Sequence, residues 1–463
     1  MRLCVFSFLG LILLLPNGYC KSDIHVGYRL TLAVPVEYMV GFIGRAYVLQ
    51  GDQNENEPSF RAALTVEAIG QKYSCSLEVL LGDVRVWNSG HYSKFYTSDI
   101  CVLELTSNGD LQLTGPKDRV GWRTGTSGQG VERLQIQRTG NLVLVDSINL
   151  IKWQSFNFPT DVMLWGQRLD IATRLASFPT NSNSFYTFEI HPNKVALYLN
   201  SGKVKYSYWE FKPTQNRNIS YLGLGTKGLE LYNDKSQIAQ IPSIQPPRFL
   251  SLENTTGNLG LYIFSAMKKK FEASFQALKN TCDLPLACNP YGICTFSNSC
   301  SCIRLLLKQT QMRNSACGKE ISDGFCNGGF PVDMLELHGV SSILKDAKTI
   351  INITKEACAN FCINDCECVA ALYSSGDPRE CFLYGVVMGV KQVERDSGFS
   401  YMVKVPKGSH GNHSKSNVKK WVVVLVAVVD SLIIMLIFGG LIFYFIRKRR
   451  KSSLGNRSNS CRN

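Results

Sequence analysis

The sequence predicts a mainly β, modular protein that folds outside the cytosol and carries one transmembrane helix. Three observations support this prediction: alternating apolar stretches over residues 24–275, two dense groups of cysteines after residue 281, and an apolar run near the C-terminus. Alternation interrupted by turn residues favours short β-strands. Closely spaced cysteines are typical of disulfide-stapled modules made in an oxidising compartment.

The first 20 residues are predicted to be a secretory signal peptide. Arg2 supplies a positive start, residues 5–15 are apolar, and Gly18 and Cys20 are small residues next to the expected cut. This is the pattern that signal peptidase recognises. A retained N-terminal anchor is the alternative, but the apolar run is short for a stable span.

A second apolar segment, residues 422–446, is long enough to cross a bilayer core of roughly 30 Å. Trp421 lies at its first edge, and a run of five basic residues, 447–451, follows its second. The positive-inside rule assigns such a run to the cytoplasm. We therefore expect a single-pass type I protein of the plasma membrane, with residues 406–421 as a stalk and residues 447–463 as a cytoplasmic tail.

The net charge of +14 agrees with this topology. Seven of the lysines and arginines lie in residues 447–463, which contain no acidic residue. Such a cluster attracts anionic lipid, so the basic balance does not indicate nucleic acid binding.

The cysteine count is consistent with complete pairing outside the cell. Of the 17 cysteines, Cys4 and Cys20 fall in the signal peptide and Cys461 in the tail, which leaves an even number. A catalytic thiol would require one of the rest to stay free. We expect a glycoprotein as well, because four Asn-x-Ser/Thr sequons lie in the predicted extracellular part. The acceptors are Asn218, Asn254, Asn352 and Asn412.

Two turns of the β-rich region repeat one pattern, 31 residues apart. They are Asn108-Gly109-Asp110-Leu111-x-Leu113 and Thr139-Gly140-Asn141-Leu142-x-Leu144. A weak repeat of this kind suggests a β-prism or a similar pseudo-symmetric assembly of short sheets.

Further motifs follow in a fixed order around the second turn. They are Val86-Trp87-Asn88, Arg138-Thr-Gly-Asn-Leu-Val-Leu-Val-Asp146, Trp153-Gln-Ser-Phe156, Pro159-Thr-Asp161 and Gly166-Gln167. This series resembles the bulb-type (G-type) lectin domain of plant S-domain receptor-like kinases. The resemblance implies a bulb-type lectin β-prism domain at residues 21–170 and a second S-domain-like β region at residues 171–277.

The first cysteine group resembles the EGF-like module of the same family, expected at residues 278–318. The resemblance implies the disulfides Cys282–Cys294, Cys288–Cys300 and Cys302–Cys317. The residues before Cys282, Lys279-Asn280-Thr281, lack the acidic signature of a calcium-binding module. We therefore expect a rigid spacer.

Residues 322–405 resemble a PAN/apple α+β domain. Thr354 can cap a helix that begins near Lys355, which would place Cys358 and Cys362 on one helix face. The resemblance implies the disulfides Cys358–Cys381 and Cys362–Cys368. Two further pairs follow by elimination, Cys326–Cys366 and, in the lectin region, Cys75–Cys101.

A sugar site of this lectin family requires Gln-x-Asp-x-Asn-x-Val-x-Tyr on one strand. The best match is Gln137, Thr139, Asn141, Val143 and Val145, in which Thr replaces Asp and Val replaces Tyr. Loss of the carboxylate removes a charge-assisted hydrogen-bond acceptor. The other repeat, residues 106–114, matches less well. We expect a retained fold without a mannose site, and mannose binding through these five residues is the alternative.

Taken together, the modules resemble plant S-domain receptor-like proteins with lectin, EGF-like and PAN modules but no kinase. The chain shows no His-Arg-Asp catalytic loop, and the predicted tail is too short for a kinase domain. The leading hypothesis is therefore a kinase-less receptor-like glycoprotein, a co-receptor or decoy that binds an extracellular ligand or a partner receptor. It is not expected to be an enzyme or to need a cofactor or metal.

The expected partners are a protein such as a receptor kinase, a second copy of the chain in a homodimer, or a glycan, and no nucleic acid. Asp430 lies within the predicted span, where a carboxylate is costly and often functional. It can pair with a basic residue in a partner's transmembrane helix, or it can stay protonated or near the interface. The second functional hypothesis is a carbohydrate-binding cell-wall lectin or adhesion protein.

Overall fold

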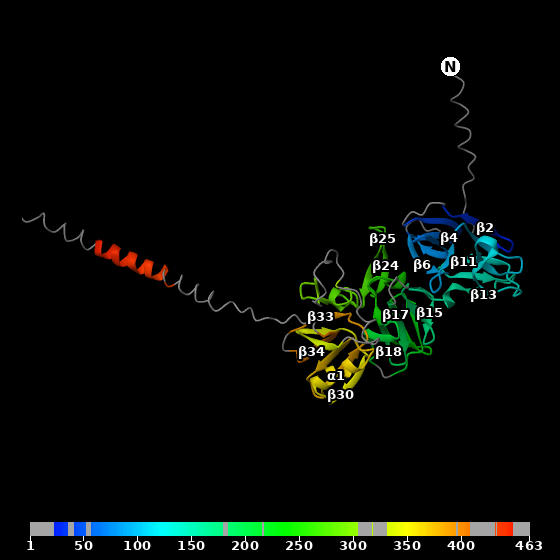
Figure 1. Cartoon of the computed structure of the whole chain (residues 1–463). Helices are drawn as coiled ribbons and strands as arrows, with labels where there is room; N and C mark the ends of the chain where they lie inside the picture. The colour runs from blue at the N-terminus through cyan, green and yellow to red at the C-terminus, as the bar shows by residue number, and fades with distance from the viewer. Residues whose placement is uncertain are drawn as a thin grey trace, which may run out of the picture. The chain divides into compact units, whose positions relative to one another are not determined.

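The computed structural model describes residues 23–35, 41–51, 57–178, 184–214, 217–303, 317, 331–394, 397–407, 431 and 433–447 (Figure 1). The chain divides into two compact units. The first contains residues 1–303 and 313–404, and the second contains residues 304–312 and 405–463. The described part is mainly β, as predicted.

The first β-prism, residues 23–154, consists of three antiparallel sheets around a common apolar core. Its strands in sheet order are β1 (Asp23–His25), β11 (Arg133–Ile136), β12 (Leu142–Val145) and β13 (Ile151–Gln154); β10 (Val120–Arg123), β9 (Leu111–Thr114), β8 (Ile100–Leu105) and β2 (Arg29–Ala33); and β3 (Ile43–Gln50), β4 (Phe60–Ile69), β5 (Lys72–Leu81) and β6 (Val84–Asn88), with β7 (Phe95–Thr97) beside β5.

Three tryptophans close this core with approximate threefold symmetry. Trp87, Trp122 and Trp153 lie on β6, β10 and β13, so each sheet contributes one. Their ring centroids are 5.9 to 6.1 Å apart and the rings meet edge to face. This is a favourable geometry for aromatic rings, and it joins the three sheets at one point.

The repeated turn motif adopts the same geometry twice. Gly109 and Gly140 both have φ above +80°, a conformation that favours glycine. Each donates its N–H to the carbonyl of the residue three positions earlier, Thr106 or Gln137, at 2.9 Å. A side chain at Gly140 would meet the Phe60 ring at 2.4 Å. The repeat therefore reflects equivalent turns of two sheets.

The second β-prism, residues 162–276, is again built from three four-stranded antiparallel sheets. Its strands in sheet order are β14 (Val162–Leu164), β23 (Phe249–Leu252), β24 (Leu259–Ser265) and β25 (Lys270–Gln276); β15 (Arg168–Asp170), β20 (Tyr221–Gly225), β21 (Gly228–Asn233) and β22 (Ser236–Pro242); and β16 (Arg174–Ala176), β17 (Ser184–His191), β18 (Lys194–Ser201) and β19 (Val204–Phe211). The sheets therefore divide near residue 155, whereas the expected boundary lies at residue 170.

The segment that the sequence predicts to be EGF-like shares a sheet with the segment that follows it. β26 (Gly292–Cys294) and β27 (Cys300–Cys302) form a hairpin, and β26 pairs in parallel with β33 (Val390–Gln392), which pairs with β29 (Val340–Ser342). Lys391 Nζ also lies 2.7 Å from Asp283 Oδ1. These contacts hold the hairpin against its neighbour.

The PAN-like segment packs one helix against a five-stranded sheet. The sheet contains, in order, β28 (Val332–His338), β34 (Phe399–Pro406), β31 (Ala370–Ser374), β32 (Glu380–Tyr384) and β30 (Lys348–Ile351). The helix α1 (Lys355–Asn364) begins at Thr354, whose Oγ accepts a hydrogen bond from Ala357 N at 3.2 Å. Cys358 and Cys362 are its buried residues, as the predicted cap and spacing required.

Three short 3-10 helices complete the elements with defined bounds: η2 (Pro116–Asp118), η3 (Ser155–Asn157) and η4 (Thr281–Asp283). In the second unit, residues 433–447 are helical. Within the described part of the chain, no helix combines the length and apolar character needed to cross a bilayer. Residues 422–430 of the predicted span, including Asp430, lie outside the described residues, as do the predicted signal peptide and Asn412.

Candidate ligand-binding surfaces of the prisms

The five residues of the sugar-site motif lie on the β11–β12 hairpin, but they do not form an open face. Gln137 is exposed and Thr139 is half-buried. Asn141 is only 3% exposed, and Val143 and Val145 are buried within β12. Of the five motif residues, Gln137 is therefore the one with a side chain that a ligand could readily reach.

Asn141 is fully engaged inside the prism. Its Nδ2 donates to Gln154 Oε1 at 2.8 Å, with Gln137 Oε1 a more distant acceptor at 3.4 Å. Its Oδ1 accepts from Ser155 Oγ at 3.2 Å and from Phe156 N at 3.3 Å. An amide whose donors and acceptor are used in this way stabilises the loop after β13 and has little capacity left for a sugar hydroxyl.

The equivalent residue of the other repeat, Asp110, has the same structural role. Its Oδ1 accepts from Thr124 Oγ at 3.0 Å and from Thr126 N at 3.1 Å. Asn141 and Asp110 thus each tie a turn to the loop that follows the last strand of their sheet. At both positions, the polar residue that falls in the sugar-motif alignment is used for hydrogen bonds inside the prism.

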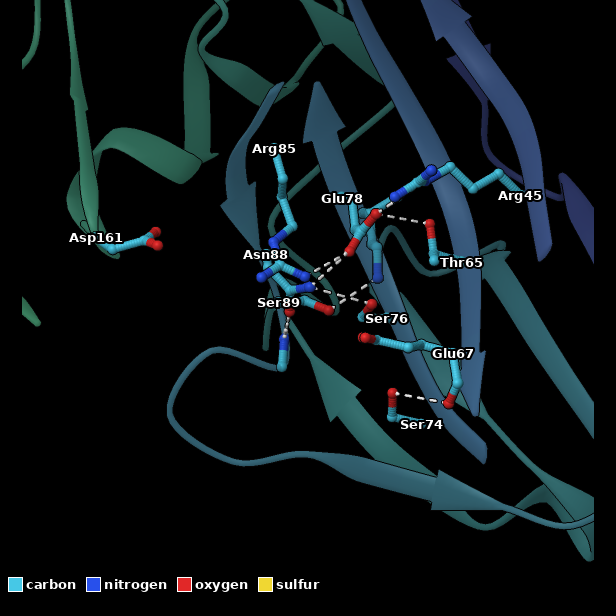
Figure 2. Close-up of polar contacts among 12 residues, drawn as sticks. Arg45, Thr65, Glu67, Ser74, Ser76, Glu78, Arg85, Asn88, Ser89 and Asp161 are labelled. Carbon is cyan, nitrogen blue, oxygen red and sulfur yellow. Dashed lines mark hydrogen bonds and ion pairs between the residues drawn. The ribbon is translucent and has the colours of Figure 1, made fainter. Parts of the chain in front are cut away.

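The third sheet carries a polar cluster that the sequence analysis missed (Figure 2). Glu78 on β5 has a side chain that is 2% exposed. Its Oε2 accepts from Thr65 Oγ at 2.9 Å and from Arg45 Nε at 3.3 Å. Its Oε1 accepts from Asn88 Nδ2 at 2.9 Å and from Arg85 Nη1 at 3.3 Å. The carboxylate therefore has four donors, two of them cationic.

This Glu78 cluster stabilises the sheet rather than forming an open site. A buried carboxylate is tolerated when it is paired and hydrogen-bonded, and both conditions are met. Arg45 and Arg85 approach from β3 and β6 with side chains 31% and 33% exposed. The only sequence signal is the alternation Ser74-x-Ser76-x-Glu78 in an otherwise apolar strand, and it does not reveal the partners on three other strands.

The two prisms and the segment between them are joined by a buried hydrogen bond from His91 and by two partly buried ones. His91 Nε2 lies 2.7 Å from Ala176 O, and Tyr92 donates its hydroxyl to Pro159 O at 2.7 Å. Asn254 Nδ2 donates to Asp161 Oδ2 at 2.8 Å. Burial lowers the pKa of His91, while the charge of Asp161 acts in the opposite direction. His91 is therefore a neutral donor at this junction at neutral pH.

The sequons differ in how accessible their acceptors are. Asn218 and Asn352 are exposed. Asn254 is half-buried, and besides its bond to Asp161 its Oδ1 accepts from Phe178 N at 2.5 Å. Glycosylation of Asn254 would attach the glycan to a half-buried amide nitrogen that already donates to Asp161. The exposed Asn218 and Asn352 are therefore the better-placed acceptors.

Six disulfides are present among the described residues. They are Cys75–Cys101, Cys282–Cys294, Cys288–Cys300, Cys302–Cys317, Cys358–Cys381 and Cys362–Cys368. Cys366 is exposed and has no disulfide partner within the described ranges, and Cys326, its predicted partner, lies outside them. Disulfides in this number are typical of proteins that fold in an extracellular or secretory compartment.

Comparison with known families identifies two domains. Residues 86–181 match the family described as D-mannose binding lectin, and residues 334–405 match the PAN-like domain. The resemblances to a bulb-type lectin domain and to a PAN domain are confirmed, and the EGF-like resemblance stays a prediction. The chain thus combines a lectin-type domain with a PAN-like domain.

Similar plant proteins are named for a PAN domain or for a G-type lectin receptor. The chain is 26% identical to a PAN domain-containing protein of Arabidopsis thaliana, over 65% of this chain and 60% of that protein. It is 27% identical to a G-type lectin S-receptor-like serine/threonine-protein kinase of the same plant, over 70% of this chain and 41% of the kinase. An EP1-like glycoprotein is 25% identical, over 70% of this chain and 79% of the glycoprotein. The match thus spans less than two thirds of the first two relatives.

Among solved structures, a monomeric mannose-binding lectin from Gastrodia elata matches 29% of this chain and 96% of its own length, with 21% identity and a TM-score of 0.19.

Proposed function

We propose that this protein is a cell-surface, receptor-like glycoprotein whose ectodomain recognises an extracellular ligand or a partner receptor. The observation that carries the proposal is the state of Asn141, whose amide is consumed inside a lectin-type prism. A lectin fold without the usual polar face is a scaffold for another form of recognition. The names of the related S-receptor-like kinases support a receptor role.

In this proposal the chain is a kinase-less co-receptor or decoy, not an enzyme. It spans the plasma membrane once through residues 422–446 and is glycosylated on its extracellular side. Its partners are a receptor kinase or a second copy of the chain. Asp430 would contribute to that association from within the membrane, where a carboxylate without a partner is costly.

The second candidate is a carbohydrate-binding lectin or adhesion protein of the cell wall. The name of the matched family, D-mannose binding lectin, favours it. Gln137 is the member of the motif that remains exposed, so mannose binding on this hairpin would depend on it.

A mannose-oligomer titration of the full chain and of Gln137→Ala tests the two candidates. We expect no saturable mannose binding by either protein. Saturable binding that falls at least tenfold in Gln137→Ala would overturn the proposal in favour of the lectin. Gln137 is a better probe than Asn141, because replacing Asn141 would also break the loop after β13.

The receptor role is tested by recovering the tagged full chain from the cell surface together with its partners. We expect a membrane partner whose recovery falls severalfold in Asp430→Leu, while Asp430→Asn retains part of it through a hydrogen bond. Recovery of the chain from the surface with no partner, and no change in Asp430→Leu, would contradict the co-receptor proposal.

A further inference from the structure

A groove of about 600 Å³ opens at the junction of the two prisms. Tyr92 and residues 157–159 line it from the first prism and the connection between the prisms. Residues 171–174 and 189–191 line it from the second prism. Its volume lies in the range of small-ligand sites, and its walls combine aromatic rings with charged and polar groups. No motif of the sequence pointed to it.

Two exposed aromatic rings flank this groove and both are held in place. Tyr92 is 59% exposed, and its hydroxyl is fixed by the bond to Pro159 O at 2.7 Å. Phe158 is 51% exposed and stacks on Trp153 with a centroid distance of 5.8 Å. Rings that are already ordered lose little conformational entropy on binding. Their negative faces suit the C–H faces of a sugar ring.

At the groove, two cations, Arg174 and Lys205, share the single carboxylate of Glu189. Glu189 accepts from Lys205 Nζ at 2.5 Å and from Thr187 Oγ at 2.8 Å. Arg174 Nη1 is 3.9 Å from Glu189, and its side chain is 54% exposed. Since Lys205 already balances Glu189, the guanidinium of Arg174 can accept a carboxylate, for which its fork of N–H donors is matched.

The rings and the cation face the same space. Tyr92, Phe158 and Arg174 all line it. Burial raises the pKa of the Tyr92 hydroxyl, the positive charge of Arg174 opposes that rise, and the negative charge of Asp161 adds to it. His191 lies beside them, with Nε2 2.8 Å from the Tyr198 hydroxyl. A ligand in the groove would thus meet aromatic faces, the guanidinium of Arg174, which is only weakly paired, and hydrogen-bonding groups together.

We propose that this groove binds an acidic oligosaccharide, with its carboxylate on Arg174 and its sugar rings against Tyr92 and Phe158. The inference rests on the proposed extracellular recognition and names a ligand class for it. An acidic peptide fits less well, because the outer edge of β16 is occupied. Ala176 N donates to Thr160 O at 2.9 Å and Ala176 O is bonded to His91, so a peptide strand cannot extend the sheet there.

The test is calorimetric titration of the full chain in detergent with four probes: oligomers of galacturonic acid, their methyl esters, mannose oligomers and oligo-glutamate. We expect saturable binding of the acid form and at least tenfold weaker binding of the ester, which has the same rings without the charge. Arg174→Gln should weaken acid binding at least tenfold, as loss of a charge-assisted pair predicts. Tyr92→Leu should weaken both forms.

Arg168→Gln is the matched control. Arg168 is exposed on the neighbouring strand β15, over the Tyr221 ring at 4.7 Å and away from the groove, so its loss should leave binding unchanged. Equal binding of acid and ester, insensitivity to Arg174→Gln, or tighter binding of oligo-glutamate would each overturn the proposal. If the chain still reaches the cell surface and its partner but does not bind galacturonic acid oligomers, this inference alone is overturned. The proposed function would then stay intact.

Discussion

At the scale of single residues, the first prism contains a carboxylate buried in an otherwise apolar strand. Glu78 contributes no apolar burial, yet its four donors come from three other strands, β3, β4 and β6. A hydrogen-bonded cluster of this kind fixes the alignment of those strands more strictly than apolar packing alone, because a shift in register would leave the carboxylate unpaired.

Removal of this charge should therefore destabilise the prism. In Glu78→Gln, Arg45 and Arg85 would face each other without the carboxylate, and we expect a loss of about 2–3 kcal/mol, moderated because both arginines reach solvent. Urea unfolding monitored by hydrogen exchange in β4 and β5 measures the effect. Glu104→Gln is the control, since Glu104 pairs with the exposed Arg29 at 2.9 Å and should cost less than about 1 kcal/mol. Equal losses in both variants would contradict this view of Glu78.

At the scale of elements, the start of α1 depends on Thr354, which is also the third residue of the Asn352 sequon. Thr354→Ala removes the cap and the sequon together, Thr354→Ser keeps both, and Asn352→Gln removes only the sequon. Loss of an N-cap costs roughly 1 kcal/mol, so amides 355–364 should exchange roughly fivefold faster in Thr354→Ala. Thr354→Ser and Asn352→Gln should behave like the native chain, and faster exchange in Asn352→Gln would assign the effect to the glycan instead.

Elements whose signals are local were predictable from the sequence. Thr354 and the cysteine spacing predicted α1, and the repeated Gly109 and Gly140 turns predicted equivalent hairpins, because capping and positive φ are decided within a few residues. The candidate site was less predictable. The sequence around Asn141 partly matches the sugar-site motif. The Asn141 side chain, however, is hydrogen-bonded to Gln154 on another strand and to Ser155 just after it. No local sequence pattern predicts these two bonds.

At the scale of the whole molecule, the junction of the prisms was the least visible feature in the sequence. It depends on His91 and Tyr92 after β6, on residues 157–161 of the connection, and on Ala176 and Asn254 of the second prism. These positions are up to 163 residues apart and share no motif. The same contacts that join the prisms also hold Tyr92 beside the groove, so the stability of the junction and the shape of the groove are linked.

The stability of the junction is predicted to depend on pH, because His91 lies within it. Because burial lowers the pKa of His91, the folded chain binds fewer protons than the unfolded chain below the ordinary histidine pKa of about 6.5. The contribution of neutral His91 to the free energy of unfolding is therefore complete above that pH. It is lost as the pH falls through the lowered pKa of His91, by up to about 1.4 kcal/mol per pH unit. The groups facing His91 are Asp161, which opposes the shift, Arg85, which adds to it, and the rings of Tyr92 and Phe178.

Replacement of His91 by a residue that does not titrate separates this effect from general acid denaturation. His91→Gln retains an N–H donor for Ala176 O, so between pH 8 and 5 its thermal midpoint should fall less steeply than that of the native chain. His25→Gln is the control, because His25 is exposed on β1 and its loss should leave the slope unchanged. Parallel pH profiles for the native chain and His91→Gln would show that the junction does not titrate. A shallower profile for His91→Gln would mean that acid loosens the contact between the prisms, and with it the position of Tyr92 at the groove.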